Sequence, residues 1–233
     1  KLLILTQKMA QNDPILGFFH RWVEEFSKHF EKITIICLEE GKHYLPENVK
    51  VLSLGKEKGE SKIKYLFNFY KYIWQERKNY DAVFVHMNQE YVLLGWDSWK
   101  FLGKKIYLWR NHAKGNLPTR LAVLVSNKVF CTSPNSYTAK FKKTKIMPVG
   151  IDTEFFKPDP STARKPNSIL FLGRISPVKK VLEFIEWVKG TSYNVTIAGP
   201  ILDRDRKYGE VVQHSVLHSG GKIKYLGPVS QEE

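Results

Sequence analysis

The sequence has few of the residues that build metal and disulfide sites. It contains two cysteines in 233 residues, Cys37 and Cys131, and each lies at the end of an apolar run. Cysteines in such positions are usually reduced and buried. Two cysteines so far apart form neither a zinc-binding pair nor a disulfide framework, and no His-Glu-x-x-His occurs. We therefore expect a cytoplasmic protein with no metal site.

Several common active-site sequences are also missing. The chain has no Walker A loop, no Gly-x-Ser-x-Gly elbow and no Gly-x-Gly-x-x-Gly after its first apolar run. These absences argue against a P-loop enzyme and against the usual dinucleotide-binding domain. No apolar run approaches the length of a bilayer span, and no signal-peptide pattern opens the chain.

Acidic residues are in the minority, and the formal net charge is +14. Such a charge suits an anionic lipid surface, a phosphorylated substrate or nucleic acid, or it is a solvated basic surface without a ligand. The lysines are scattered and are not interleaved with aromatic residues as in RNA-binding proteins. We therefore expect no nucleic-acid partner, while an anionic membrane surface stays open.

Short apolar runs alternate with helical patterns in the first part of the chain. Between the first two runs, apolar residues recur at helical spacing from Ile15 to Phe30. This alternation is typical of a parallel sheet covered by helices. The runs that we interpret as strands are residues 2–5, 33–37, 82–86, 106–109 and 128–132.

A segment rich in proline, serine and charge, residues 157–168, interrupts this alternation and is typical of a linker. A strand at 169–172, a helix at about 178–189 and strands at 194–198 and 223–226 then follow. We expect an α/β protein with an N-terminal Rossmann-like domain at 1–150, a linker at 151–168 and a partial second Rossmann-like domain at 169–233. Three strands make a thin second sheet, so the chain looks truncated.

The helix predicted over residues 61–78 carries an unusually broad apolar stripe bordered by lysines. Its members are Ile63, Leu66, Phe67, Tyr70, Ile73 and Trp74, and it is widened by Tyr65, Phe69 and Tyr72. One interpretation is a helix that lies on an anionic membrane surface. The other is an ordinary covering helix whose stripe faces the sheet.

Polar residues follow several of the predicted strands. In doubly wound folds, ligands bind at the carboxyl ends of the strands, and helix amino termini attract phosphate. Gly17, after the first strand, could allow a close backbone approach there, or it could serve packing alone. His86 ends one strand, and Arg110, Asn111 and His112 follow the next. We expect these four to line a polar substrate site, with His112 the strongest candidate.

The stretch ILFLGRISPVKK, residues 169–180, ends a strand with cationic side chains. Gly173 frees the turn, and Pro177 suits the first turn of a helix. Arg174 and Lys179 lie five residues apart across this strand–turn–helix unit, so both could reach one diphosphate.

The order of these segments resembles glycosyltransferase family 4, also called group 1. That family has Asn-Gly-Val-Asp-x-x-x-Phe followed by Gly-Arg-x-x-x-x-Lys-Gly. Gly150, Asp152 and either Phe155 or Phe156 match the first element. Gly173, Arg174 and Lys179 match the second. The resemblance covers the whole chain and is strongest from about residue 126 onward.

The resemblance implies a GT-B fold and a retaining, metal-independent hexosyltransferase. The donor would be a UDP- or GDP-linked sugar. The basic composition and the helix over 61–78 suggest a glycan or a lipid-linked acceptor at the inner face of the membrane. Arg174 and Lys179 would hold the donor diphosphate beside Gly173, and His112 would contact the sugar, so these three side chains are the candidate catalytic residues. Gly17 would be a further contact to the donor. Possible contacts to the sugar or acceptor are His86, Arg110 and Asn111. The nucleotide would lie against Gly199, Pro200, Gly227 and Val229.

The sequence departs from the family pattern at several positions. Val149 replaces the usual asparagine, and Lys180 replaces the usual glycine. The glycine pair of the first loop is reduced to Gly17. The family's Glu-x7-Glu element does not occur before the sequence ends at Glu233. We therefore expect the chain as given to be weakly active or inactive.

Two alternatives to a transferase are open. One is a non-catalytic GT-B-like module that binds anionic lipid or nucleic acid through its basic surface. The other is a GT-B-like enzyme of a different kind, such as a sugar-nucleotide epimerase.

Overall fold

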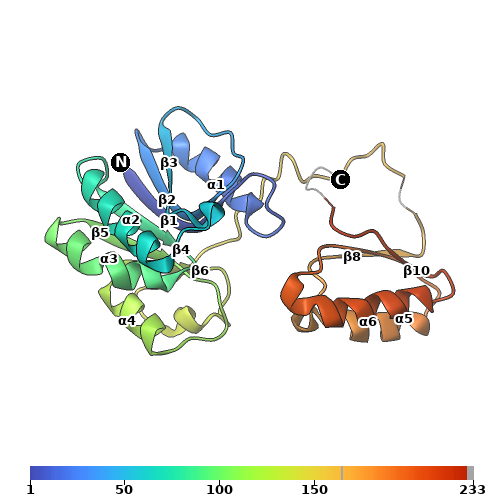
Figure 1. The fold of residues 1–233 in the computed structure, drawn as a ribbon. Helices are drawn as coiled ribbons and strands as arrows, with labels where there is room; N and C mark the ends of the chain where they lie inside the picture. Colours follow the sequence, from blue (N-terminus) through green and yellow to red (C-terminus); the bar gives the residue numbers. More distant parts are fainter. Residues whose placement is uncertain (164, 230–233) are drawn as a thin grey trace. The chain divides into compact units, whose positions relative to one another are not determined.

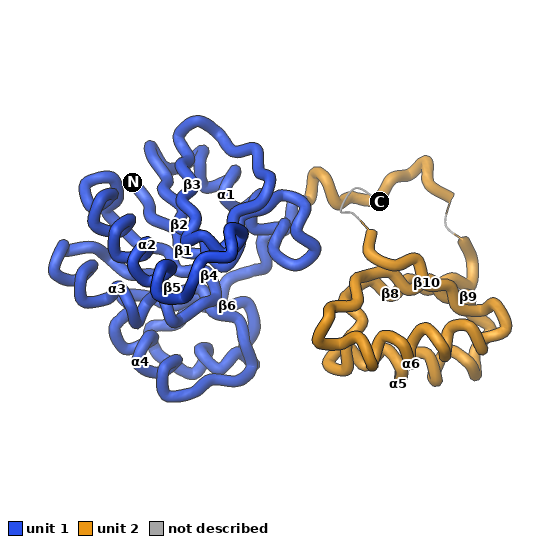
Figure 2. The backbone as a smooth tube through the Cα atoms, in the orientation of Figure 1, with its two compact units in different colours: residues 1–152 blue, residues 153–233 orange. Residues whose placement is uncertain are grey.

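The computed structural model describes residues 1–163 and 165–229. It divides into two compact units, Lys1–Asp152 and Thr153–Glu233 (Figure 2). The division falls just inside the segment expected to be a linker. Each unit is an α/β structure built on its own parallel sheet.

Unit 1 has a seven-stranded sheet in the order β3-β2-β1-β4-β5-β6-β7 (Figure 1). All its neighbouring strands are parallel. Their bounds are β1 Leu2–Met9, β2 Ile33–Glu40, β3 Val49–Ser53, β4 Ala82–His86, β5 Lys105–Trp109, β6 Lys128–Cys131 and β7 Thr144–Ile146. In chain order, β2 and β3 are added on one side of β1, and β4 to β7 are added on its other side. The strand order therefore switches between β1 and β4, and in such sheets ligands bind at this switch point.

The helices of unit 1 cover both faces of this sheet because the central strands alternate between two apolar clusters. Leu3 and Leu5 of β1 pack with α2 (Lys62–Gln75), α3 (Gln89–Phe101) and α4 (Leu117–Val125). Leu2 and Ile4 pack on the other face with α1 (Gly17–Ser27). Successive side chains of a strand point to opposite faces, so both faces of the sheet are apolar and covered by helices, as the apolar runs predicted.

Both cysteines are free and buried, as their apolar surroundings predicted. Burial raises the pKa of the Cys37 thiol to about 12. This thiol therefore stays protonated at neutral pH and is a poor nucleophile.

Unit 2 has three parallel strands in the order β10-β9-β8. Its elements are β8 Ser168–Leu172, the 3₁₀ turn η3 Pro177–Lys179, α5 Val181–Lys189, β9 Asn194–Ala198, η4 Asp203–Asp205, α6 Arg206–Leu217 and β10 Ile223–Tyr225. Both helices contribute to one apolar cluster with the strands. On β8, Leu170 and Leu172 are exposed instead.

The helix expected over 61–78 forms as α2, but most of its apolar stripe does not face the sheet. Phe69 and Ile73 are buried, and the Asn68 side-chain amide donates to the Leu54 carbonyl at 3.0 Å. The other members of the stripe, Ile63, Leu66, Phe67, Tyr70 and Trp74, are exposed. The interpretation in which the stripe faces the sheet holds for Phe69 and Ile73 and is wrong for these five residues.

Candidate functional site

The carboxyl edge of the sheet in unit 2 brings together backbone from three separate segments. The Gly173 N–H donates to the Ala198 carbonyl at 2.9 Å, and the Ile175 N–H donates to the Pro200 carbonyl at 3.0 Å. The Gly199 N–H donates to the Gly227 carbonyl at 2.7 Å. The predicted donor-binding residues Gly173, Arg174, Gly199, Pro200 and Gly227 therefore lie at one edge. Val229 follows at the end of the described segment and is half-buried.

Gly199 makes this close approach of segments sterically possible. A Cβ atom added to Gly199 would lie 2.0 Å from the carbonyl oxygen of Gly173. Its φ of +143° is also one that residues with side chains rarely adopt. The Tyr225 hydroxyl donates to the Gly199 carbonyl at 2.8 Å and fixes the turn from the neighbouring strand.

Arg174 and Lys179 are the cations of this edge. Arg174 is half-buried beside the fully buried Ile175, and Lys179 is exposed on η3. Within residues 1–163 and 165–229, neither side chain has a hydrogen-bond or ion-pair partner. An arginine side chain without a carboxylate partner is well suited to bind an anion.

The turn that carries Lys179 differs from the expected helix start. Pro177 does occupy the first helical position, but of the short η3, and α5 begins only at Val181. The Tyr208 hydroxyl accepts the Leu182 N–H at 3.1 Å, so this helix-terminal donor is already bonded. The N–H of Leu182 is therefore not available to an anion.

Lys180 occupies a left-handed conformation, with φ +53° and ψ +41°. Residues with a Cβ atom adopt this region at a cost of about 1–2 kcal/mol, and glycine adopts it freely. Lys180, which stands where the family pattern has glycine, thus has a strained backbone conformation.

Lys180→Gly should raise the unfolding free energy of unit 2 by about 1 kcal/mol, because it removes this strain. Urea denaturation monitored by amide hydrogen exchange in α5 would measure this change in the unfolding free energy. Lys71→Gly, the same change in the interior of α2, should instead destabilise unit 1 by about 1 kcal/mol. A loss of stability in Lys180→Gly would contradict the conformational argument.

At the carboxyl edge of the sheet in unit 1, polar side chains from strands far apart in sequence meet. The Asn88 side-chain amide donates to the side chain of Gln7, which joins the segment after β4 to β1 at the switch point. Asn111 and Thr132 are bonded reciprocally after β5 and β6. The exposed Asn111 thus lies at this edge, as expected.

Arg110 has a structural role at this edge. Its Nε donates to Gln89 Oε1 at 2.6 Å, and its Nη2 donates to the Lys114 carbonyl at 3.3 Å. The hydroxyl of the buried Thr119 donates to the same Gln89 oxygen at 2.8 Å. Sequence patterns did not indicate Gln89 or Thr119, because neither spacing nor charge marks them. Arg110 thus positions the loop after β5, and its expected contact with a sugar or acceptor stays a prediction.

His112 lies in the loop that Arg110 positions. Its ring is exposed, and its Nδ1 lies 3.0 Å from both the N and the O of Lys114. The His112 carbonyl accepts the Tyr137 N–H at 2.9 Å, which ties the loop to the rest of unit 1. Because the Lys114 backbone occupies Nδ1, Nε2 is the ring atom that can meet a ligand.

His86 has a packing role in the core instead of a place at the surface. It is 1% exposed, stacks on Phe19 at 4.0 Å between ring centroids and lies 3.2 Å from Thr6 Oγ1. Burial lowers the pKa of His86 to about 3. The expected contact with a sugar or acceptor requires a surface that this ring does not have.

Burial of His86 should make unit 1 sensitive to acid. The unfolded chain takes up a proton near pH 6.5 and the folded state does not, so stability is complete above that pH and is lost as the pH falls toward 3. We expect a loss of about 2 kcal/mol at pH 5. The buried His20, whose pKa burial also lowers, adds to this slope. Urea denaturation at several pH values would measure it. An equally steep dependence of the unfolding free energy on pH in His86→Asn, whose side chain does not titrate in this range, would contradict this assignment.

Gly17 begins α1 and is packed against its own preceding loop. Its N–H donates to the Asp13 carbonyl at 2.9 Å, and an added Cβ atom would lie 2.6 Å from the carbonyl oxygen of Gln11. The Asp13 carboxylate accepts the N–H groups of Ile15 and Leu16. The expected donor contact at Gly17 is therefore replaced by loop packing, since these helix-terminal amides are already bonded.

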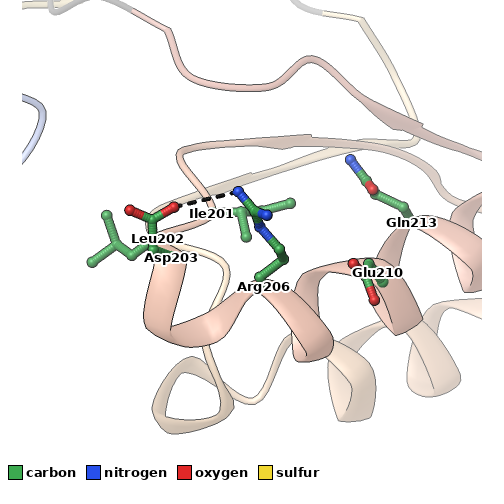
Figure 3. A pocket seen from close by; sticks show the side chains of 6 residues that line it. All are labelled: Ile201, Leu202, Asp203, Arg206, Glu210 and Gln213. Carbon is green, nitrogen blue, oxygen red and sulfur yellow. Dashed lines mark ion pairs between the residues drawn. The ribbon is translucent and has the colours of Figure 1, made fainter.

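A shallow pocket of about 380 Å³ lies over the start of α6 in unit 2 (Figure 3). Arg206 and Asp203 form an ion pair of 3.6 Å at its rim, and both side chains are largely exposed. Exposed pairs of this kind contribute little to stability. The pocket follows the Gly199–Pro200 turn in sequence but contains none of the predicted donor residues.

In the part of the chain that the structure describes, no three His, Cys, Asp or Glu side chains form a group that could hold a metal ion. None of the described helices has the length and apolar character needed to cross a membrane.

No family model and no curated protein matches the sequence, but solved structures match the fold. HepE of Anabaena, solved with UDP and glucose, is 16% identical with a TM-score of 0.72, covering 98% of this chain and 69% of HepE. Starch synthase IV of Arabidopsis thaliana is 12% identical with a TM-score of 0.66, covering 99% and 74%. The UDP-GlcNAc 2-epimerase of Methanocaldococcus jannaschii is 16% identical with a TM-score of 0.53, covering 100% and 74%. These likenesses show that the chain has the GT-B fold.

Proposed function

We propose that this chain is the nucleotide-sugar-binding part of a glycosyltransferase of family 4. The observation that carries the proposal is the carboxyl edge of unit 2, where backbone from three segments converges beside Arg174 and the turn η3 that follows carries Lys179. Neither of these cations has a partner among the described residues. The order of the sequence motifs and the fold shared with HepE, which was solved with UDP and glucose, support the same conclusion.

Charge explains what these groups would do. When a glycosidic bond to a diphosphate breaks, negative charge grows on the leaving phosphate. Donors already fixed at that position stabilise the transition state more than the ground state. Arg174 offers a planar pair of N–H donors for two phosphate oxygens, and Lys179 adds a point charge. We therefore assign the diphosphate to these two residues without a metal, and the UDP or GDP nucleotide to the turns at Gly199 and Gly227.

His112 is the group we assign to the donor sugar, through Nε2. We further propose a retaining transfer of a hexose, in which the donor phosphate helps to deprotonate the acceptor. The acceptor class that fits the basic chain is a glycan or a lipid-linked molecule, reached from the cytoplasmic side of the membrane.

An epimerase is the second candidate, because a UDP-GlcNAc 2-epimerase shares the fold. The test is incubation with UDP- and GDP-sugars, with and without glycan and lipid-linked acceptors, followed by mass spectrometry and NMR of the sugar. A transferase releases nucleoside diphosphate and forms a glycoside only when acceptor is present. Conversion of the donor to its epimer without acceptor would contradict our proposal and support the second candidate.

A further inference from the structure

The outer face of α2 is apolar and exposed. It consists of Ile63, Leu66, Phe67, Tyr70 and Trp74, and Ile63 and Phe67 are 82% and 61% exposed. A groove of about 740 Å³ follows this face as far as Ser98 of α3. The two helices lie side by side (Figure 1), and the Tyr70 hydroxyl donates to the Leu94 carbonyl at 2.9 Å. Large contiguous apolar patches of this kind mark interaction sites in folded proteins.

The fold of unit 1 does not require these side chains. Phe69 and Ile73 already pack α2 into the core, and Asn68 ties the helix to the Leu54 carbonyl. The outer face is therefore a second apolar surface on a helix that is already packed on its inner side.

Cations surround this face. Within its bounds α2 contains Lys62, Lys64 and Lys71 and no acidic residue. The Lys64 ammonium lies 5.4 Å from the centre of the Phe67 ring, and the Arg77 guanidinium lies 4.8 Å from that of Trp74. Asp97, beside Ser98 on α3, is an acidic neighbour. Long cationic side chains next to exposed aromatic rings are typical of helices that lie at a membrane interface.

We propose that the outer face of α2 docks on an anionic lipid bilayer. The apolar side chains would enter the boundary between headgroups and acyl chains, and the lysines would meet lipid phosphates. Charge favours this occupant over a second copy of the chain, since a symmetric contact would bring the lysines of both copies together. The proposal does not depend on sugar transfer.

The test is flotation of the 233-residue chain with vesicles of phosphatidylcholine alone or with 30 mol% phosphatidylglycerol. We expect binding to the anionic vesicles that weakens as salt rises. The double variant Ile63→Ser/Phe67→Ser should bind at least ten-fold more weakly, because it removes the apolar contacts. Lys64→Gln/Lys71→Gln should also bind more weakly and should lose much of the salt dependence.

Matched controls separate this face from general stickiness. Leu117→Ser/Leu124→Ser changes two exposed apolar residues of α4, and Lys128→Gln/Lys142→Gln removes two exposed lysines elsewhere on unit 1. Both should bind like the original chain. The proposal would be overturned if the control variants lost as much vesicle binding as the α2 variants, or if the chain bound only to neutral vesicles. It would also be overturned by a dimer in sedimentation velocity that Ile63→Ser/Phe67→Ser abolishes. The last result would assign the face to a second copy.

Discussion

Replacing Arg174 with alanine should lower kcat/KM for the nucleotide-sugar donor by roughly 30- to 1,000-fold, the equivalent of about 2–4 kcal/mol. The reason is that the Arg174 guanidinium would donate to the phosphate charge that grows as the bond to the sugar breaks. The measurement is donor turnover in a form of the protein that shows activity. Lys179→Ala should follow with a smaller loss, because an exposed ammonium is a less oriented donor.

The same variant should leave stability nearly unchanged. Arg174 has no hydrogen bond or ion pair with any described residue, so its removal should alter the unfolding free energy by less than about 0.5 kcal/mol. Arg120→Ala, on the exposed surface of α4, is the matched control and should change neither quantity. Full turnover in Arg174→Ala, or an equal loss in Arg120→Ala, would remove the phosphate role from Arg174.

Replacing Gly199 with alanine should destabilise unit 2 by about 3 kcal/mol or more. The new methyl group would lie 2.0 Å from the Gly173 carbonyl oxygen, so two backbone segments must separate. A unit of roughly 80 residues has only about 4–12 kcal/mol of stability to lose. Hydrogen exchange of β8 and β9 would measure the effect, since their pairing depends on this contact.

Gly220 provides the control for backbone strain. It also has a positive φ, +63°, but an added Cβ atom would meet nothing within 4 Å. Gly220→Ala should therefore cost about 1 kcal/mol, from conformation alone. Equal effects of the two substitutions would show that the close approach to Gly173 has no energetic importance.

The sequence predicted the strands of unit 1 that are buried on both faces, because a short, unbroken apolar run is typical of such strands. It missed β3 and β7, whose residues are partly buried or exposed and show no such run. For α2, periodicity could not decide which apolar face meets the sheet. The face that meets the sheet also carries Asn68, whose side-chain amide donates to the Leu54 carbonyl, and no sequence pattern indicates this contact.

The sequence was also informative about the site in unit 2, since Gly173, Arg174, Gly199 and Gly227 follow strands that pair in parallel. In unit 1 the histidine at a strand end was ambiguous. His86 is the last residue of β4, where the chain still packs under Phe19, whereas His112 lies three residues beyond β5. Whether a strand-end side chain points into the core or into solvent depends on register and on the covering helix, and neither is visible in one sequence.

Calorimetric titration of the 233-residue chain with UDP, GDP and the matching nucleosides tests the central assignment most directly. If Arg174 and Lys179 hold a diphosphate, one of the two diphosphates should bind at least ten-fold more tightly than its nucleoside. That difference should disappear in Arg174→Ala/Lys179→Ala and persist in Arg120→Ala. Equal affinities for nucleoside and diphosphate, or an undiminished preference in the double variant, would contradict the account.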